Sequence, residues 1–322
     1  MRSGFNQSAC RNDQTAASCF AKSLHLGMNS SSSLKITVWL ILCLIWGSTW
    51  VVIKIGLGDL PPLGFAATRF FLAVVILFII LRALKIPLPK GRAQWKLMAL
   101  TGVLQFSVNY SLIFWAEQHI SSGLTAVLQA TISVFGLLLA WKFLPTERIT
   151  PLKISAVVLG LAGVAVIFSD QLRVQDTMAF FGSAAVIVSA YAASQSSILV
   201  KARGAGIHPG AMVWSQMVCG LPPVIAWSLI AEGNPLRYHW TWQAVACVLY
   251  LTVIGTIAAF WLFYWLLERV ESNQAMMISV VTPLIAVLIG WLVLGETLPA
   301  QTAIGGALVM SSIALIVIRR RA

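Results

Sequence analysis

Charged side chains are scarce in this chain. Only 10% of its 322 residues are Asp, Glu, Lys or Arg, whereas 59% are apolar. Soluble domains have roughly 25% charged and 45–50% apolar residues. A water-soluble fold of this length could not hide so much apolar surface. The composition therefore excludes an ordinary soluble protein and indicates one that lies in a lipid bilayer.

Motifs for catalysis or metal binding are also missing. The five cysteines have no redox or metal spacing, and the four histidines are scattered over the tail and loops. Gly305-Gly306 has no lysine partner, so it does not resemble a nucleotide-binding loop. We therefore expect no catalytic residues, no metal site and no cofactor.

Long apolar runs dominate the remainder of the chain. Each is about the twenty residues that cross the hydrocarbon core as a helix, and lipid offers backbone polar groups no other partner. The sequence predicts an all-α integral membrane protein with ten transmembrane helices. The ten runs are 36–56, 62–82, 96–115, 121–143, 150–169, 178–200, 210–231, 242–267, 272–294 and 299–318.

Basic residues account for the net charge of +12. In a soluble protein this charge would suggest nucleic acid as a partner, but here Lys and Arg gather in alternate loops. If the N-terminus is cytoplasmic, the outer loops hold only Arg173 and Arg237. This asymmetry is the positive-inside pattern. It predicts a multi-pass cell-membrane protein, in contact with lipid and not nucleic acid, with both termini in the cytoplasm.

The first 33 residues are polar and rich in Ser, Asn and Gln. They lack the apolar core and cleavage site of a signal peptide, so we interpret them as a disordered cytoplasmic tail. Met28 stands just before the first span, and translation starting there is an alternative. The last four residues, 319–322, form a short basic C-terminus on the same side.

The two halves of the chain resemble each other. Trp141 and Trp291 each follow an apolar run, and Glu147 and Glu296 each precede a proline and a second run. In the same way Lys54 precedes Pro62 by eight residues, and Lys201 precedes Pro209 by eight. A nearly constant offset predicts one five-helix unit used twice, over 34–169 and 178–318. Because five is odd, the second unit is inverted across the membrane, as in alternating-access transporters.

Several short motifs occur in order across roughly residues 34–318. They are Ile45-Trp46-Gly47-Ser48-Thr49-Trp50, Ala67-Thr68-Arg69-Phe70, Ala116-Glu117-Gln118-His119 before Ser121-Ser122-Gly123, Thr282-Pro283-Leu284 and Gly295-Glu296-Thr297. These motifs resemble EamA-type proteins of the drug/metabolite transporter superfamily, and their combination is more specific than any one of them. Ser133 and the small residues near Ala190 and Tyr191 depart from the usual pattern of that family.

This resemblance implies a central cavity and the export or exchange of small metabolites, such as amino acids, related compounds or drugs. Two alternatives remain open. A multidrug or quaternary-ammonium exporter would need an acidic residue in the cavity, and none is evident. An intramembrane enzyme or sensor would need a nucleophile and base at depth, metal ligands, or a soluble output domain, and the sequence provides none of these.

Arg69 is the residue that the bilayer penalises most, by roughly 2.5–3.5 kcal/mol. It lies about 10 Å from the outer end of its span, on the same side as Asp59 and Glu117. It serves either as a partner of Glu117 in an outer-gate ion pair, as an anchor for a substrate carboxylate, or as a structural clamp between helices. We favour the clamp, because polar residues often join helices in bundles.

The other charged residues near the spans are better explained by structural roles than by substrate binding. Lys54 can extend its side chain to the interface, and Glu147 and Glu296 at span ends suit capping or loop pairing. No Asp or Glu lies in the middle of a span, and Glu117 is the nearest candidate. Proton-driven pumps usually have such a buried group. The sequence therefore favours facilitated export or exchange over tight proton coupling.

Uncharged polar residues at membrane depth are the candidate lining of the cavity. Three pairs are spaced four residues apart, so each pair shares a helix face. They form either the cavity wall or hydrogen bonds between helices. Trp46 lies deep in its span and suits an aromatic or cationic solute, whereas Trp261 suits core packing. The pairs are Gln105 with Asn109, Gln129 with Ser133, and Tyr191 with Gln195.

Small residues recur at a spacing of four in two spans. Ala156 and Gly160 lie in the fifth, and Ala303, Ala307 and Ser311 in the tenth. Such spacing lets helix backbones approach closely. A homodimer through these two spans and packing within one chain are both compatible with this pattern.

Overall fold

The computed structural model describes residues 32–120, 125, 128–167, 169, 177–294 and 300–318, and all regular structure in these ranges is helical. Most of the predicted tail, Ser121, Ser122, Gly123, Glu296 and the basic C-terminus lie outside the described residues. The described helices are α2 (Ser32–Gly56), α3 (Pro62–Ala83), α4 (Arg92–Gly102), η2 (Val103–Asn109), α5 (Tyr110–Ala116), α7 (Ile132–Phe143), α8 (Pro151–Ile167), α9 (Thr177–Arg203), α10 (Pro209–Ala231), η4 (Pro235–Arg237), α11 (Trp242–Thr252), η5 (Val253–Ala258), α12 (Ala259–Leu267), α13 (Ser272–Met276), α14 (Ile278–Leu294) and α15 (Ala300–Ile318).

Six continuous helical segments in the described ranges are long and apolar enough to cross a membrane. They are Ser32–Gly56, Pro62–Ala83, Arg92–Ala116, Thr177–Arg203, Pro209–Ala231 and Trp242–Leu267. Ile132–Phe143 and Pro151–Val166 are shorter apolar helices. The run expected at 272–294 is divided into α13 and α14 at Met277. The prediction of an all-helical, multi-pass membrane protein is thereby confirmed.

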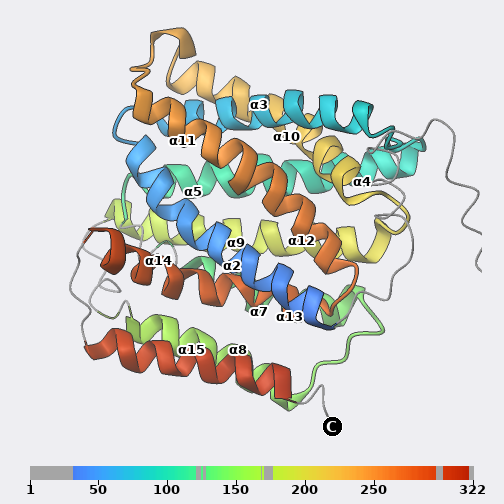
Figure 1. Ribbon diagram of the computed structural model, residues 1–322, viewed down its shortest axis with the longest axis vertical. Coiled ribbons are helices and arrows are strands. Elements are labelled where there is room, and N and C mark those ends of the chain that lie inside the picture. Colours follow the sequence, from blue (N-terminus) through green and yellow to red (C-terminus); the bar gives the residue numbers. More distant parts are fainter. Residues whose placement is uncertain are drawn as a thin grey trace, which may run out of the picture.

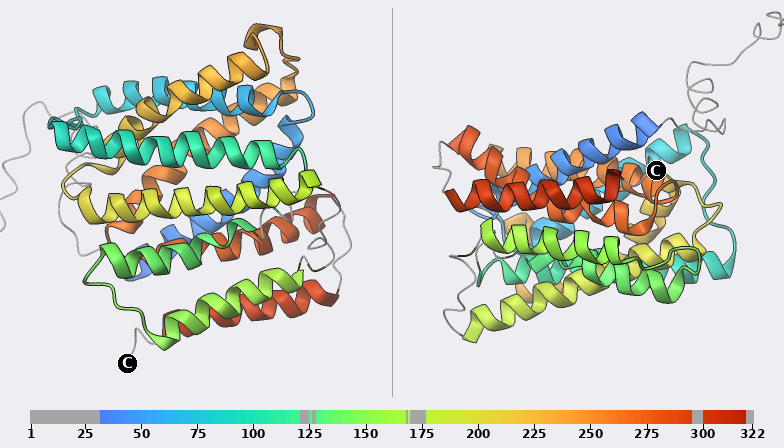
Figure 2. Two further views of the ribbon diagram at one scale, coloured as in Figure 1. Left: turned by 180° about the vertical axis from the view of Figure 1, so that it is seen from behind. Right: turned by 90° about the horizontal axis from the view of Figure 1, so that it is seen from below.

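The helices lie in layers that mix the front and back of the chain (Figure 1). α3 and α10 pack together along one side, and α8 and α15 pair along the opposite side (Figures 1 and 2). Between them, α14 packs on α2 and α7 packs on α9. Helices that are distant in sequence therefore lie side by side, and the middle layers are built from both parts of the chain.

Successive helices run back and forth, so their connections gather at two opposite ends of the bundle. We name these ends after one carboxylate residue at each, Glu147 and Asp59. The Glu147 end has the connections 84–91, 144–150, 204–208 and 268–271. The Asp59 end has the connections 57–61, 117–120 and 232–241.

Two glycines let α4 and α10 cross with their backbones in contact. A Cβ atom on Gly102 would lie 2.1 Å from the carbonyl oxygen of Gln216, and one on Gly220 would lie 2.4 Å from that of Gly102. The Ser107 hydroxyl donates to the Gly220 carbonyl at 2.5 Å, and Gln216 Nε2 donates to Thr101 Oγ1 at 2.7 Å. Close approach and hydrogen bonds between helices are the usual means of packing in lipid.

Two helical spans contain a segment of π-helix. η2 divides the span that begins with α4, and η5 divides the span that begins with α11. The first residues of these segments, Val103 and Val253, are 150 positions apart, which is the offset from Trp141 to Trp291. π-helical turns are rare and frequently occur at functional sites.

The small residues of α8 pack within the chain. Ala156 is fully buried, and a Cβ on Gly160 would lie 2.7 Å from Val280 Cγ1 and 3.0 Å from Ser312 Oγ. Ala307 and Ser311 of α15 are exposed instead. The spacing on α8 therefore reflects packing against α14 and α15.

Candidate functional site

A cavity of about 130 Å³ lies in the middle layers of the bundle. A buried water needs about 10–15 Å³ on this scale, so the cavity has room for a small organic molecule. All of its lining side chains are uncharged. They are Trp46, Thr49, Trp50, Ile53, Gln105, Asn109, Tyr110, Ile113, Gln129, Ile132, Ala193, Ser197, Phe260, Phe263, Ala275, Met276, Ile278, Ser279 and Thr282.

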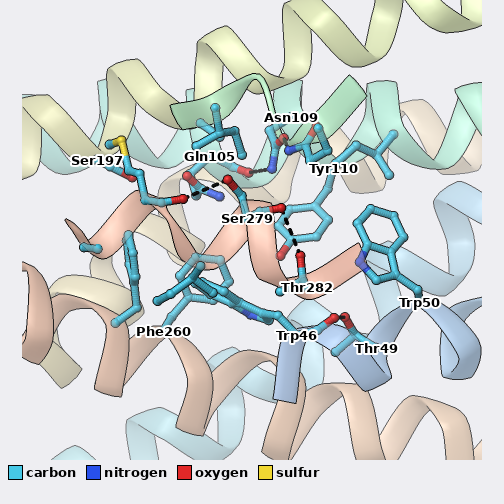
Figure 3. Close-up of a pocket in the computed structure, with 18 of the residues that line it drawn as sticks. Trp46, Thr49, Trp50, Gln105, Asn109, Tyr110, Ser197, Phe260, Ser279 and Thr282 are labelled. Carbon is cyan, nitrogen blue, oxygen red and sulfur yellow. Dashed lines mark hydrogen bonds between the residues drawn. The ribbon is translucent and has the colours of Figure 1, made fainter. Parts of the chain in front are cut away.

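A chain of amides and hydroxyls forms one wall of the cavity. Gln129 Nε2 donates to Asn109 Oδ1 at 3.2 Å, and Asn109 Nδ2 lies 3.4 Å from the Gln105 carbonyl oxygen (Figure 3). Ser189 Oγ of α9 donates to Gln129 Oε1 at 3.0 Å. These bonds fix the orientation of both amides in an environment where an unpaired polar group is costly.

Aromatic side chains form the facing wall. The Trp46 ring packs against Phe260, with ring centres 5.6 Å apart and planes at 65°, and against Phe263 at 5.3 Å. Trp46 Nε1 is buried and has no hydrogen-bond partner among the described residues. The cavity thus offers broad apolar faces on this wall (Figure 3).

Two polar side chains of α14, Ser279 and Thr282, lie near Pro283, and the proline accounts for the contact of Thr282. Pro283 has no N–H, so the Ser279 carbonyl loses the donor that an α-helix would supply four residues later. The Thr282 hydroxyl donates to this carbonyl at 3.3 Å, and Ser279 Oγ donates to the Met276 carbonyl at 2.8 Å. Both side chains line the cavity.

The structure brings together four of the six residues expected in the cavity: Trp46, Gln105, Asn109 and Gln129. Tyr191 and Gln195 are not in the lining. The Tyr191 side chain is 46% exposed and packs against Phe135 at 5.6 Å, and Gln195 Oε1 has no partner among the described residues. A spacing of four shows that two residues share a helix face, but not which way that face points.

Sequence reasoning did not propose Tyr110, Ser197, Ser279 or Thr282 for the cavity. Tyr110 follows Asn109 directly, and Thr282 belongs to the Thr282-Pro283-Leu284 motif. Both could therefore have been proposed for the cavity from the sequence. Ser197 and Ser279 had no distinguishing pattern. Ser133 lies beside the site, where its hydroxyl donates to the Met276 carbonyl at 3.1 Å.

Arg69 is held by aromatic rings and not by an acid. Its side chain is 2% exposed, and its guanidinium carbon lies 4.6 Å from the Phe70 ring centre, 4.7 Å from that of Tyr110 and 5.7 Å from that of Phe114. The structure does not bring it together with Glu117, and no ion pair of Arg69 occurs in the described ranges.

Glu117 directly follows α5 at the Asp59 end. Burial raises the pKa of its carboxyl to about 7, while the nearby positive charge of Lys54 acts in the opposite direction. Its Oε1 atom has no hydrogen-bond partner among the described residues. Glu117 is outside the lining of the cavity.

A network of charges closes the Glu147 end. The two carboxylate oxygens of Glu147 each lie 3.0 Å from the Ser272 amide nitrogen, and Lys201 Nζ pairs with Glu147 at 2.9 Å. Lys201 also donates to the carbonyls of Leu267, at 3.1 Å, and Val270. This confirms the capping interpretation for Glu147. Its loop is tied to the ends of α9 and α12 and to the start of α13.

Metal-ligating side chains do not gather anywhere in the described ranges in a group of three or more. Of the cysteines in these ranges, Cys43 and Cys247 are buried and Cys219 is partly buried.

Comparisons with known proteins agree with this architecture. The chain is 29% identical to the uncharacterized transporter YoaV of Bacillus subtilis (strain 168) over 84% of its length and 92% of the relative's. It is 30% identical to the uncharacterized inner membrane transporter YedA of Escherichia coli (strain K12) over 80% and 82%. It is 26% identical to a probable amino-acid metabolite efflux pump of the same strain over 85% and 91%.

A solved crystal structure shares the fold. It matches with a TM-score of 0.77 at 17% identity, covering 90% of this chain and 99% of that one. The EamA-like transporter family matches residues 34–169 and 180–318. The chain therefore belongs to the EamA-like transporter family and is a membrane transporter.

Proposed function

We propose that this protein exports or exchanges small organic metabolites, such as amino acids or related compounds, by alternating access through the central cavity. The observation that carries the proposal is the cavity itself, which is lined by helices of both parts of the chain. Its uncharged amide and aromatic walls suit a compact solute that has both apolar and polar groups. The printed name of one relative, a probable amino-acid metabolite efflux pump, supports this substrate class.

Alternating access in this proposal rests on ten transmembrane helices arranged as two inverted five-helix repeats. Three features support the arrangement. The π-helical segments recur at an offset of 150. The packing of α14 on α2 corresponds to that of α7 on α9, and α3/α10 and α8/α15 each pair equivalent helices. Inverted repeats give one protein two similar shapes that open to opposite faces.

The Glu147 end faces the cytoplasm in this arrangement, and so do both termini. The distribution of Lys and Arg supports this orientation, because the loops of the Asp59 end hold few of them. Reporter fusions after Glu147 and after Glu296 should report opposite compartments. Exposure of both positions on one face would contradict the inverted arrangement.

Transport is tested with purified protein in liposomes and a panel of labelled amino acids, amines and organic acids. We expect saturable uptake of at least one neutral solute. Gln129→Leu should lower its uptake about tenfold, because the variant leaves Asn109 without its donor. Tyr191→Leu is the matched control, since Tyr191 lies on the exposed face of α9, and it should change uptake less than about twofold.

Coupling is tested in the same vesicles. Facilitated export or exchange predicts that uptake follows the solute gradient and is stimulated by solute loaded on the opposite side. Uphill uptake that a protonophore abolishes would show proton coupling. Absence of uptake for the whole panel, or equal uptake by wild type and Gln129→Leu, would overturn the proposed function.

A further inference from the structure

Arg69 carries a positive charge, and no acidic side chain of the described ranges forms an ion pair with it. Its 2% exposure leaves little access to water, and its Nε atom has no hydrogen-bond partner among the described residues. The rings of Phe70, Tyr110 and Phe114 surround the guanidinium and present the negative faces of their π systems to it, and the Tyr110 side chain is also its hydrogen-bond partner. A charge in this setting creates a field that extends beyond its own cage, because few mobile charges screen it.

Tyr110 connects this cage to the cavity. Its ring centre is 4.7 Å from the guanidinium carbon, and the same side chain lines the cavity. A solute in contact with Tyr110 therefore lies within roughly 10–12 Å of the charge, since contacting atoms are about 4 Å apart. At that distance and a typical interior dielectric, one unit charge changes binding by about tenfold, in opposite directions for anions and cations.

The lining itself does not offset this field. It includes no Asp or Glu to hold a cation, and its polar groups include hydrogen-bond donors. Trp46 Nε1 is without a partner in the described ranges. A carboxylate in the cavity would meet both the field of Arg69 and the hydroxyl and amide groups of the lining. An ammonium group without a carboxylate would meet the field with no compensating acid.

We propose that Arg69 sets the charge selectivity of the cavity from behind Tyr110, so that solutes bearing a carboxylate are preferred over cations of the same size. Arg69 is a positioning and electrostatic residue in this proposal, because it does not touch the solute. The inference rests on the proposed function, since it concerns the same cavity.

The test uses three probes of one shape: 3-phenylpropanoate, 3-phenylpropanamide and 3-phenylpropylamine. Their binding to the detergent-solubilised full chain is measured by calorimetry, so the result does not depend on transport. Wild type should bind the anion at least about tenfold more tightly than the amine, with the neutral amide between them. The preference should persist from about 50 to about 500 mM salt, because a buried charge is screened weakly.

Two substitutions separate a charge effect from a structural one. Arg69→Met keeps much of the side-chain volume without the charge, and it should bring the three affinities within about threefold of each other. Arg69→Lys keeps the charge and should retain the order of affinities. Tyr191→Leu, outside the cavity, should bind as wild type does.

Three results would overturn the inference: an amine that binds wild type as tightly as the anion, an Arg69→Met variant that weakens all probes equally, or no binding of any probe. If Arg69→Met does not fold, the wild-type affinities for the three probes and their salt dependence decide whether the inference holds. Loss of the preference at high salt would then assign it to surface charges. Failure of the proposed function is distinguishable, because it appears as absent uptake for the whole transport panel.

Discussion

The two ends of the bundle use their carboxylates differently. At the Glu147 end, three carboxylates pair with Lys or Arg: Glu147 with Lys201, Glu271 with Lys153 at 2.9 Å, and Glu268 with Arg269 at 3.0 Å. At the Asp59 end, the ion pair seen in the described ranges is that of Asp59 with His239, whose side chain is 79% exposed. In the described ranges, the Glu147 end thus has two Lys–Glu pairs that join separate segments, whereas the Asp59 end has one pair, with an exposed histidine.

Carboxylates at the Asp59 end mainly serve the backbone and neighbouring hydroxyls. Glu232 accepts hydrogen bonds from the amides of Leu63 and Gly64, at 2.8 and 2.6 Å, and so caps α3. Asp59 accepts from the hydroxyl of Thr241, which itself caps α11. Each of these contacts joins one pair of segments, whereas the Glu147 network joins the 144–150 loop to the ends of α9 and α12 and to the start of α13. We infer that opening the Glu147 end costs more free energy than opening the Asp59 end.

Glu147→Ala should have the largest effect on this difference. It leaves Lys201 without its acid and the Ser272 amide without its acceptor, and breaking a buried pair costs about 3–5 kcal/mol of unfolding free energy. Chemical denaturation in micelles measures it. A Glu147→Leu, Lys201→Met double variant should lose less than the two single variants together. Additive losses would show that the pair is not coupled.

Glu232→Ala tests the cap at the opposite end. Removing an acidic cap costs about 1–2 kcal/mol, because the Leu63 and Gly64 amides lose their acceptor and the helix dipole loses a favourable charge. The same denaturation experiment applies, with Glu232→Gln as the variant that keeps an acceptor. A loss as large as that of Glu147→Ala would remove the distinction between the ends.

Glu117→Gln should remove a pH-dependent loss of stability of up to about 3 kcal/mol. The folded pKa is about 7, above that of an ordinary carboxyl, so folding favours the protonated form. The wild type therefore loses stability as pH rises from about 4.5 to 7, and the neutral amide does not. Melting temperatures at about pH 5 and pH 8 should differ less for the variant. An equal pH dependence would show that Glu117 is not the responsible group.

Glu271→Gln should have the smallest effect. Its side chain is 44% exposed, and exposed ion pairs contribute about 0–1 kcal/mol. Unfolding free energy measured at low and high salt should differ little from wild type in both conditions. A loss of several kcal/mol of unfolding free energy would mean that exposed ion pairs also stabilise the Glu147 end, in addition to the buried pair of Glu147.

Much of the fold could be predicted because apolar length alone marks a helix in lipid. The runs 62–82 and 210–231 correspond closely to α3 (Pro62–Ala83) and α10 (Pro209–Ala231). The break at Met277 and the two π-helical segments could not be predicted in this way. They depend on packing, such as the contact between Gly102 and Gly220, which no composition window records.

The candidate site was partly accessible to the same reasoning. Polar residues at membrane depth located Gln105, Asn109 and Gln129, since lipid would not tolerate them facing outward. The position of Tyr191 was harder to predict, because a phenol can lie at a helix surface with its ring packed against another ring, here that of Phe135. Arg69 shows the same limit. Sequence suggested an acidic partner, but aromatic rings can shelter a guanidinium too, and only the fold decides between them.

The π-helical segments also determine how this chain should be aligned with its relatives. A π-turn winds more loosely than an α-turn, so η2 rotates every later side chain of its span relative to the earlier ones. A helical wheel that uses one angle per residue from Arg92 to Ala116 would therefore give the wrong angle between the Leu97 and Tyr110 side chains around the helix axis. Deleting one residue within Val103–Asn109 would tighten the coil and turn Tyr110 away from the cavity, while the helix would stay long enough to span the bilayer.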